Sequence, residues 1–215
     1  MSEKILIIGK NSNICKEFLK KIPKSKFIFQ PTKKNWNMKS IDFDSKKINL
    51  IKKVDKILIL QSVISSIPFL KRRSSDIASQ VSINLLSVVK ICEVALQHNR
   101  KVKIIILGSE SGIKGSFDIV YSLTKAAIHK YVEERKIKYP AQQLICLAPS
   151  TIIDSHMTIE RKDKRNVHKS IINNPKKRGI LSKEISNLIY TLFYEQTDYI
   201  SNTVIRIDGG KFARM

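Results

Sequence analysis

Short runs of apolar residues recur along the chain, and stretches with helical spacing separate them. Residues 4–9, 56–61, 102–107 and 142–148 are each almost continuously apolar. Runs of this kind are typical of strands that are buried on both faces, as in a parallel sheet. Residues 76–98 instead carry apolar side chains at spacings of three and four, which predicts a long helix. With further strands expected at 25–29, 40–43 and 199–207, the alternation predicts a single α/β domain with a doubly wound parallel sheet of about seven strands.

The strand expected at 102–107 leads into the stretch with the clearest chemistry. It ends in Gly108 and Ser109, and a helix predicted over 119–139 then carries Tyr121 and Lys125 four residues apart, on one face. A phenol ionises near pH ~10, and a neighbouring ammonium lowers that pKa. A hydroxyl such as that of Ser109 would hold a substrate oxygen beside the phenol. This combination predicts a site that moves a proton to or from a carbonyl or an alcohol.

A tyrosine and a lysine at this spacing more often form a surface pair, so the complete pattern has to support the functional interpretation. A strand is followed by Gly-Ser-x-Ser-Gly and then by Tyr-x-x-x-Lys-Ala-Ala. This pattern resembles the short-chain dehydrogenase/reductase family, and the likeness extends over about residues 4–210, with Asp-Gly-Gly at its end. The resemblance implies a Rossmann-type fold. It also implies that Tyr121 is the general acid/base, that Lys125 lowers its pKa and binds the nicotinamide ribose, that Ser109 holds the substrate oxygen and that Asn84 supports a proton relay.

The first apolar run ends in a turn that matches the family's cofactor site only in part. A strand, a glycine turn and a helix N-terminus together make a cradle for phosphate groups. Here Gly9 is the one glycine left of the family's Thr-Gly-x-x-x-Gly-x-Gly, because Asn13 and Cys15 stand at the other two positions. Asn tolerates a left-handed backbone better than most residues. We therefore expect Gly9, Ser12, Asn13 and Ile14 to contact a nicotinamide cofactor.

Other parts of the chain complete the expected cofactor site. No acidic residue follows the second strand, and Lys33 and Lys34 stand there instead, so NADP is favoured over NAD. The resemblance places Asp42 near the adenine ring, and it places Pro149 and Ile152 on the loop beside the nicotinamide. Gln61 falls where most family members have Asn-Asn-Ala-Gly, which is a second departure. A substrate lid is expected at about residues 154–180.

Composition and charge bear on the number of domains, the partners and the cellular location of the protein. The 215 residues are 42% hydrophobic, which suits one globular domain, and the net charge is +22. Such a charge indicates either a nucleic-acid partner or a solvated basic surface, but the lysines are scattered and no aromatic residues alternate with them. We expect no specific nucleic-acid binding, no membrane-spanning segment and a cytoplasmic protein. The three cysteines are expected to be reduced, and the four histidines show no metal-ligand spacing, so no metal site is expected.

Two functions remain open. The first is an NAD(P)-dependent oxidoreductase that interconverts a carbonyl and an alcohol on a small-molecule substrate. The second is a non-catalytic relative, regulatory or structural, that kept the fold while its cofactor turn degenerated. By analogy with the family, the protein is expected to form a homodimer or a homotetramer.

Overall fold

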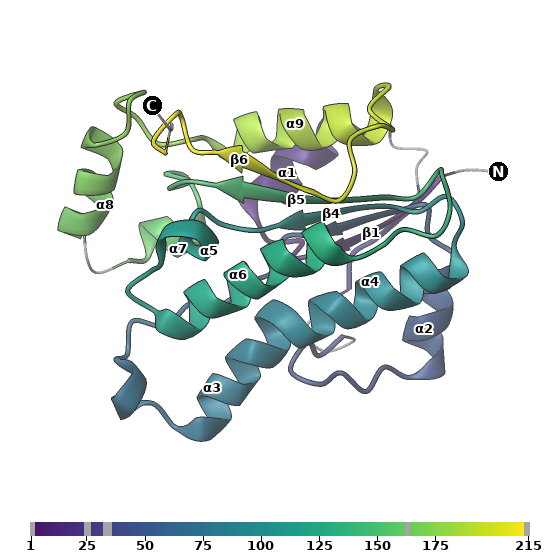
Figure 1. Cartoon of the computed structure of the whole chain (residues 1–215), viewed down its shortest axis with the longest axis horizontal. Coiled ribbons are helices and arrows are strands. Elements are labelled where there is room, and N and C mark those ends of the chain that lie inside the picture. The colour runs from purple at the N-terminus through teal and green to yellow at the C-terminus, as the bar shows by residue number, and fades with distance from the viewer. Residues whose placement is uncertain (1–2, 24–26, 32–35, 162–163, 213–215) are drawn as a thin grey trace.

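Six parallel strands form one central sheet, with helices on both of its faces (Figure 1). This computed structural model describes residues 3–23, 27–31, 36–161 and 164–212. The strands lie in the order β2-β1-β3-β4-β5-β6. Their bounds are β1 Lys4–Ile8, β2 Phe27–Phe29, β3 Lys56–Ile59, β4 Lys103–Leu107, β5 Gln143–Pro149 and β6 Thr203–Ile207. The predicted Rossmann-type doubly wound sheet is confirmed.

The central strands are apolar at almost every position because both of their faces are covered. Every residue of β3 and of β5 is buried. One row across the sheet shows the consequence: Ile7 of β1 pairs with Leu58, Leu58 with Ile105, and Ile105 with Ile145. A strand with a solvated face would alternate between apolar and polar residues instead.

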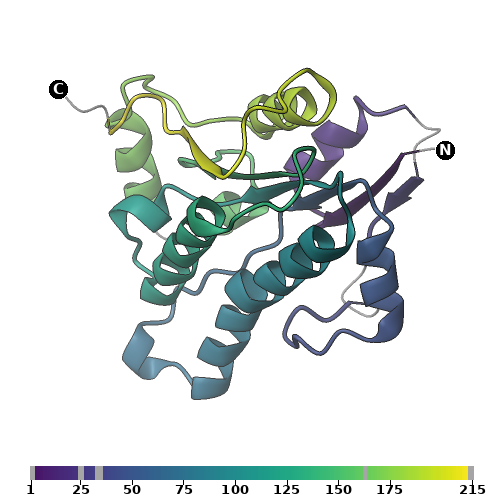
Figure 2. The same ribbon diagram turned by 45° about the vertical axis from the view of Figure 1, so that its right-hand side comes forward.

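One face of the sheet is covered by α2 (Ser45–Lys52), by a long helical segment and by α6 (Ile119–Glu134), as Figures 1 and 2 show. The long segment consists of α3 (Ser74–Val81), a π-helical turn (Ser82–Leu86) and α4 (Ser87–His98). By length and composition it is apolar enough to cross a membrane, but half of its most apolar window is buried inside the protein. Most of its apolar side chains pack into the core, as expected for a helix that covers a sheet.

The opposite face is covered by α1 (Asn13–Leu19) and α9 (Ser182–Tyr194), which pack side by side. The rings of Phe18 and Phe193 meet there with their centroids 6.0 Å apart. The remaining short elements are a 3-10 helix at Phe69–Lys71, α5 at Ser111–Lys114, α7 at His156–Ile159 and α8 at Lys164–Ile172. The last two belong to the predicted lid, and α8 stands at one side of the molecule in Figure 1.

Two sequence-based predictions about individual elements are wrong. Residues 40–43 were expected to form a third strand, but they make a tight turn in which the Asp42 amide donates to Ser40 Oγ at 3.0 Å and the Phe43 amide donates to the Ile41 carbonyl. The sheet of the described residues therefore has six strands and not seven. The helix expected to run to residue 139 ends at Glu134, where Asn202 Nδ2 donates to the carbonyl of Val132 at 3.0 Å.

The strand order fixes where a ligand can bind. From β1 the chain crosses to β2 on one side, and it later returns to β3 on the other side of β1. The connections therefore diverge above the carboxyl ends of β1 and β3. In open α/β sheets a crevice forms at this switch point, and ligands bind in it.

The contact between α1 and α9 should account for a large part of the stability. Replacing the fully buried Phe18 with Ala leaves a cavity, so Phe18→Ala should lower the free energy of unfolding by about 3–5 kcal/mol. Phe69, which is 49% exposed, supplies a matched control, and Phe69→Ala should cost less than about 1 kcal/mol. Urea denaturation followed by circular dichroism measures both, and equal costs would contradict this account of the core.

Candidate active site

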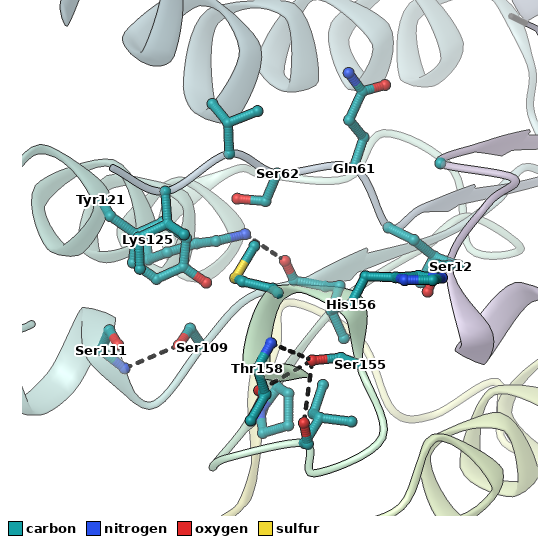
Figure 3. Close-up of a pocket in the computed structure, with 18 of the residues that line it drawn as sticks. Ser12, Gln61, Ser62, Ser109, Ser111, Tyr121, Lys125, Ser155, His156 and Thr158 are labelled. Carbon is teal, nitrogen blue, oxygen red and sulfur yellow. Dashed lines mark hydrogen bonds between the residues drawn. The ribbon is translucent and has the colours of Figure 1, made fainter. Parts of the chain in front are cut away.

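A cavity of about 1210 Å³ opens at the carboxyl ends of β1, β3, β4 and β5. Figure 3 shows part of its lining, with Ser12 and Gln61 at one end and Ser109 and Tyr121 at the other. Most of the residues predicted from the sequence line this cavity: Gly9, Ser12, Asn13, Ile14, Gln61, Ser109, Tyr121, Lys125, Pro149 and Ile152. The fold thus brings together groups that come from four strands and the segments that follow them.

The turn after β1 depends on its single glycine. Gly9 has φ +100°, and a Cβ there would lie 2.8 Å from the backbone nitrogen of Gln61. No L side chain fits such a position without strain. Ser12 then caps α1, because its hydroxyl accepts a hydrogen bond from the Ile14 amide at 3.2 Å. The tight glycine turn and the capped helix start that the resemblance predicts after the first strand are therefore both present.

Asn13 and Cys15 occupy the other two glycine positions in different ways. Asn13 is the first residue of α1, so the left-handed backbone that asparagine tolerates is not used. Its side-chain amide instead donates to the carbonyl of Asp154, across the turn. The Asp154 carboxylate in turn accepts hydrogen bonds from the amide and the hydroxyl of Ser182, at 2.9 and 2.8 Å. Cys15 is fully buried in the core under α1. The side chain of Asn13 therefore ties the turn after β1 to Asp154, where the predicted lid begins, and through Asp154 to the start of α9.

Helix α6 carries Tyr121 and Lys125 beneath the cavity. It begins where the Asp118 carboxylate accepts hydrogen bonds from the amides of Val120 and Tyr121, at 3.1 and 3.3 Å. Both predicted side chains are buried. The Lys125 ammonium donates to the carbonyl of Leu107 at 2.7 Å and lies 5.6 Å from the centre of the Tyr121 ring. Lys125 therefore anchors the end of β4 to α6.

Burial dominates the acid–base properties of this pair. It raises the pKa of Tyr121, and the groups that oppose it are the hydroxyls of Ser109 and Ser62. Burial also lowers the pKa of Lys125 to about 8. The sequence predicted that Lys125 would lower the pKa of Tyr121. In the protein alone, the pKa of Tyr121 is raised and not lowered. The loss of hydration destabilises the phenolate more than the hydroxyls of Ser109 and Ser62 stabilise it.

Asn84 lies behind the cavity and is not part of its lining. It sits in the π-helical turn between α3 and α4, and its carboxamide pairs with both backbone groups of Val63, each at 2.8 Å. It also contacts the hydroxyls of Ser62 and Thr124, at 3.2 and 3.4 Å. Among the hydrogen bonds of the described residues, Asn84 makes none with Tyr121 or Lys125. Its observed role is to hold the loop after β3, which carries Ser62 into the cavity.

The part of the cavity that was expected to hold the adenine ring is lined by residues other than the one predicted. Asp42 is exposed, pairs with the hydroxyl of Ser40 and does not line the cavity. Trp36 and Met38 line it instead and are buried, although the polar stretch around them gave no signal of a binding site. Lys33 and Lys34 lie outside the described residues, so the prediction drawn from them stays a prediction.

A second group that sequence reasoning missed surrounds the start of α6. The buried carboxylate of Asp118 accepts hydrogen bonds from Gln80 Nε2 at 2.6 Å and from the Ser65 amide at 2.8 Å, and it pairs with Arg72 at 3.3 Å. These contacts fix the loop between β3 and α3 against the helix that carries Tyr121. An aspartate just before a predicted helix is a recognisable capping signal, and this one could have been noticed.

The requirement for glycine after β1 can be tested with two matched variants. Gly9 and Gly115 both have positive φ, at +100° and +90°, but a Cβ at Gly115 would meet nothing within 4 Å. Gly115→Ala should therefore cost only the backbone strain, about 1–3 kcal/mol of unfolding free energy. Gly9→Ala should cost at least about 1 kcal/mol more, because its Cβ meets the backbone of Gln61. Chemical denaturation measures both, and an equal cost would contradict the close approach of Gly9 to Gln61.

Comparisons with known proteins place this geometry in a common fold. No protein-family model matches the sequence, and no curated protein matches it either. Solved structures do match. A short-chain dehydrogenase family protein from Francisella tularensis subsp. tularensis SCHU S4 is 17% identical, with a TM-score of 0.83 and all of both chains covered. ElxO with NADP bound is 18% identical, with a TM-score of 0.82 and all of both chains covered.

A third structure is a short-chain dehydrogenase/reductase from Brucella melitensis described as a glucose/ribitol dehydrogenase. It is 19% identical, has a TM-score of 0.81, and 99% of this chain and 97% of that chain are covered. These likenesses extend over the whole length of the proteins, although few residues are shared. The resemblance inferred from the sequence motifs is thus confirmed for the fold: the chain has the three-dimensional fold of the short-chain dehydrogenases and reductases.

Proposed function

We propose that the protein is an NAD(P)-dependent oxidoreductase of the short-chain dehydrogenase/reductase type, which interconverts a carbonyl and an alcohol on a small-molecule substrate. One observation carries the proposal. The buried side chains of Tyr121 and Lys125 and the hydroxyl of Ser109 converge at one end of a large cavity at the carboxyl edge of the sheet. A structure with the same fold, ElxO, is known with NADP bound.

The cavity fits an extended cofactor with a substrate beside it. Its volume of about 1210 Å³ exceeds the roughly 300–1,000 Å³ of usual small-molecule sites. The bare backbone at Gly9 and the hydroxyl of Ser12 suit phosphate groups at one end, and the polar groups of α6 lie at the other. A nicotinamide cofactor bound there would supply the hydride. Lys33 and Lys34 support a preference for NADP over NAD.

The chain's own residues would manage the proton. Ser109 would hold the substrate oxygen beside the phenol of Tyr121. Because burial raises the pKa of Tyr121, the phenol keeps its proton at neutral pH and is in the form that protonates a carbonyl oxygen during reduction. Lys125, held by the Leu107 carbonyl, would place positive charge under the cofactor ribose and beside the phenol.

Assembly and location complete the proposal. Three apolar side chains on the outer faces of α6 and the preceding helical segment are well exposed, and they are Leu86, Ile119 and Leu123. An apolar surface of this kind suits contact between subunits, so we expect a homodimer or a homotetramer. We place the protein in the cytoplasm, because its three cysteines are free and buried, as in a reducing compartment. We propose no specific nucleic-acid partner.

A second function is favoured by one specific observation. The side chain of Asn13 stands where relatives have a glycine and bonds to the Asp154 carbonyl, so it occupies part of the space at the cofactor turn. A protein in which this contact excludes the cofactor would be a non-catalytic regulatory or structural relative. Direct measurement of cofactor binding distinguishes the two functions.

Titration with NADPH and NADH, followed by nicotinamide fluorescence, is the test of cofactor binding. We expect saturable binding that persists at moderate salt, because a built cradle does not depend on the net charge of +22 alone. Lys33→Glu should weaken NADPH binding and leave NADH binding nearly unchanged. Failure of the wild-type protein to bind either cofactor would favour the non-catalytic function.

Replacement of the proposed acid/base tests the chemistry. Tyr121→Phe should lower kcat by at least about 100-fold, since a positioned general acid contributes about 10²–10⁴-fold. Its circular dichroism spectrum and its cofactor affinity should stay close to those of the wild type. Tyr131→Phe is a matched control on the same helix, where the hydroxyl bonds to Glu93 away from the cavity, and it should keep full activity. Full activity in Tyr121→Phe would eliminate the mechanism.

A further inference from the structure

Helix α6 presents a third polar residue in line with Tyr121 and Lys125. His129 lies one turn after Lys125 and two turns after Tyr121, so the three side chains share one face of the helix. His129 is buried, with a relative exposure of 6%. All three residues lie under the segment that joins β4 to α5 and carries Ser109.

The imidazole of His129 packs directly against the backbone on both sides of Ser109. A Cβ on Gly108 would lie 2.6 Å from Nε2 of the ring, and a Cβ on Gly112 would lie 2.7 Å from its Cε1. Real Cβ atoms do not come so close to other atoms, so only glycine leaves room for the ring at both positions. The two glycines of the Gly-Ser-x-Ser-Gly sequence therefore leave space for this histidine. The ring in turn limits how closely this segment can approach α6.

The ring also accepts a hydrogen bond from the turn. The Ser109 amide donates to His129 Nε2 over 3.5 Å, which is long but directed. A ring nitrogen that accepts carries no proton, so the proton of the neutral imidazole lies on Nδ1. The charged and titratable groups around it are Lys125 on the same helix and Cys146 on β5. Burial and the Lys125 ammonium lower the pKa of His129 to about 4, so the ring is neutral at pH 7.

The backbone around Ser109 is held at several points, and its side chain is held as well. The amides of Gly108 and Glu110 donate to the carbonyls of Leu147 and Pro149 on β5, at 2.7 and 2.9 Å. Lys125 binds the carbonyl of Leu107 at 2.7 Å, and His129 accepts from the amide of Ser109. The Ser109 hydroxyl accepts from the amide of Ser111 at 3.1 Å, and it stands beside Tyr121 in Figure 3. A shift of the Ser109 backbone would move this hydroxyl away from the phenol.

We propose that His129 is a positioning residue for Ser109: its neutral ring supports and hydrogen-bonds the Ser109 backbone, so that the hydroxyl stays where it can hold the substrate oxygen beside Tyr121. The role rests on the proposed oxidoreductase function. His129 itself touches neither the substrate nor the cofactor in this arrangement. It acts through the turn, while Tyr121 and Lys125 act from the same face of the same helix.

The first test needs neither a variant nor a substrate. Nitrogen-15 NMR of the histidine-labelled wild-type protein at pH 7 reports which ring nitrogen of His129 carries the proton. We expect the proton on Nδ1, with Nε2 bare and coupled to the Ser109 amide. A proton on Nε2 would overturn the proposal, because that nitrogen would then have nothing with which to accept a hydrogen bond.

The second test compares two amides at the same position. The carboxamide oxygen of His129→Gln reaches the place of Nε2, whereas the shorter side chain of His129→Asn does not. We expect His129→Asn to lower kcat about 10-fold or more, since a misplaced group is costly in a preorganised site. We expect His129→Gln to stay within about threefold of the wild type. The KM for the cofactor should not change in either variant.

A double-mutant cycle shows whether the loss passes through Ser109. In a Ser109→Ala background, His129→Asn should cause little further loss of kcat, because the hydroxyl that it positions is already gone. Equal losses in the Gln and Asn variants, or full additivity with Ser109→Ala, would overturn the positioning role while wild-type turnover still supported the oxidoreductase. A wild-type protein with neither turnover nor cofactor binding would overturn both.

Discussion

The burial of both faces of the sheet is the constraint on which the rest of the structure depends. It makes the central strands apolar along their length, so polar groups can gather only where the strands end. The strand order then opens a crevice at the carboxyl ends of β1 and β3, and the cavity forms there. Within it, buried polar groups take backbone partners: the Lys125 ammonium finds the Leu107 carbonyl, and Asn84 finds both backbone groups of Val63.

Sequence patterns predicted well what depends on local chemistry. Apolar runs located all six strands, although the last expected segment begins four residues before β6, and the spacing of Tyr121 and Lys125 placed both on one buried face of α6. Ten of the predicted site residues line the cavity, because most of them lie in the segments that follow strand ends, and Tyr121 and Lys125 lie on the face of α6 that points toward it. Contacts between distant segments could not be predicted from local sequence patterns. No such pattern indicated that the Asn13 side chain bonds to Asp154 or that Asp42 is exposed.

The two faces of α6 differ in burial, and the side chains on the buried face therefore have shifted pKa values. Its inner face carries Tyr121, Lys125 and His129. Burial raises the pKa of the tyrosine and lowers the pKa of the lysine and of the histidine, and each shift favours the neutral form of the side chain. Its outer face carries the exposed Ile119 and Leu123. The sequence identified the first two inner residues by their family spacing. It missed His129, because the ring fits only where Gly108 and Gly112 leave room for it, and these glycines lie about 20 residues away in the chain.

Asn202, which precedes β6, connects the end of the chain to this helix. It adopts a left-handed backbone with φ 50°, its amide donates to the Leu144 carbonyl at 2.7 Å, and its side chain donates to the carbonyls of Val132 and Arg135 at the end of α6. The helix that carries Tyr121 thus receives its C-terminal cap from a residue made some 70 positions later. During synthesis on the ribosome this cap can form only after Asn202 has emerged, so the carbonyls at the end of α6 lack these partners while the helix and β5 are being made.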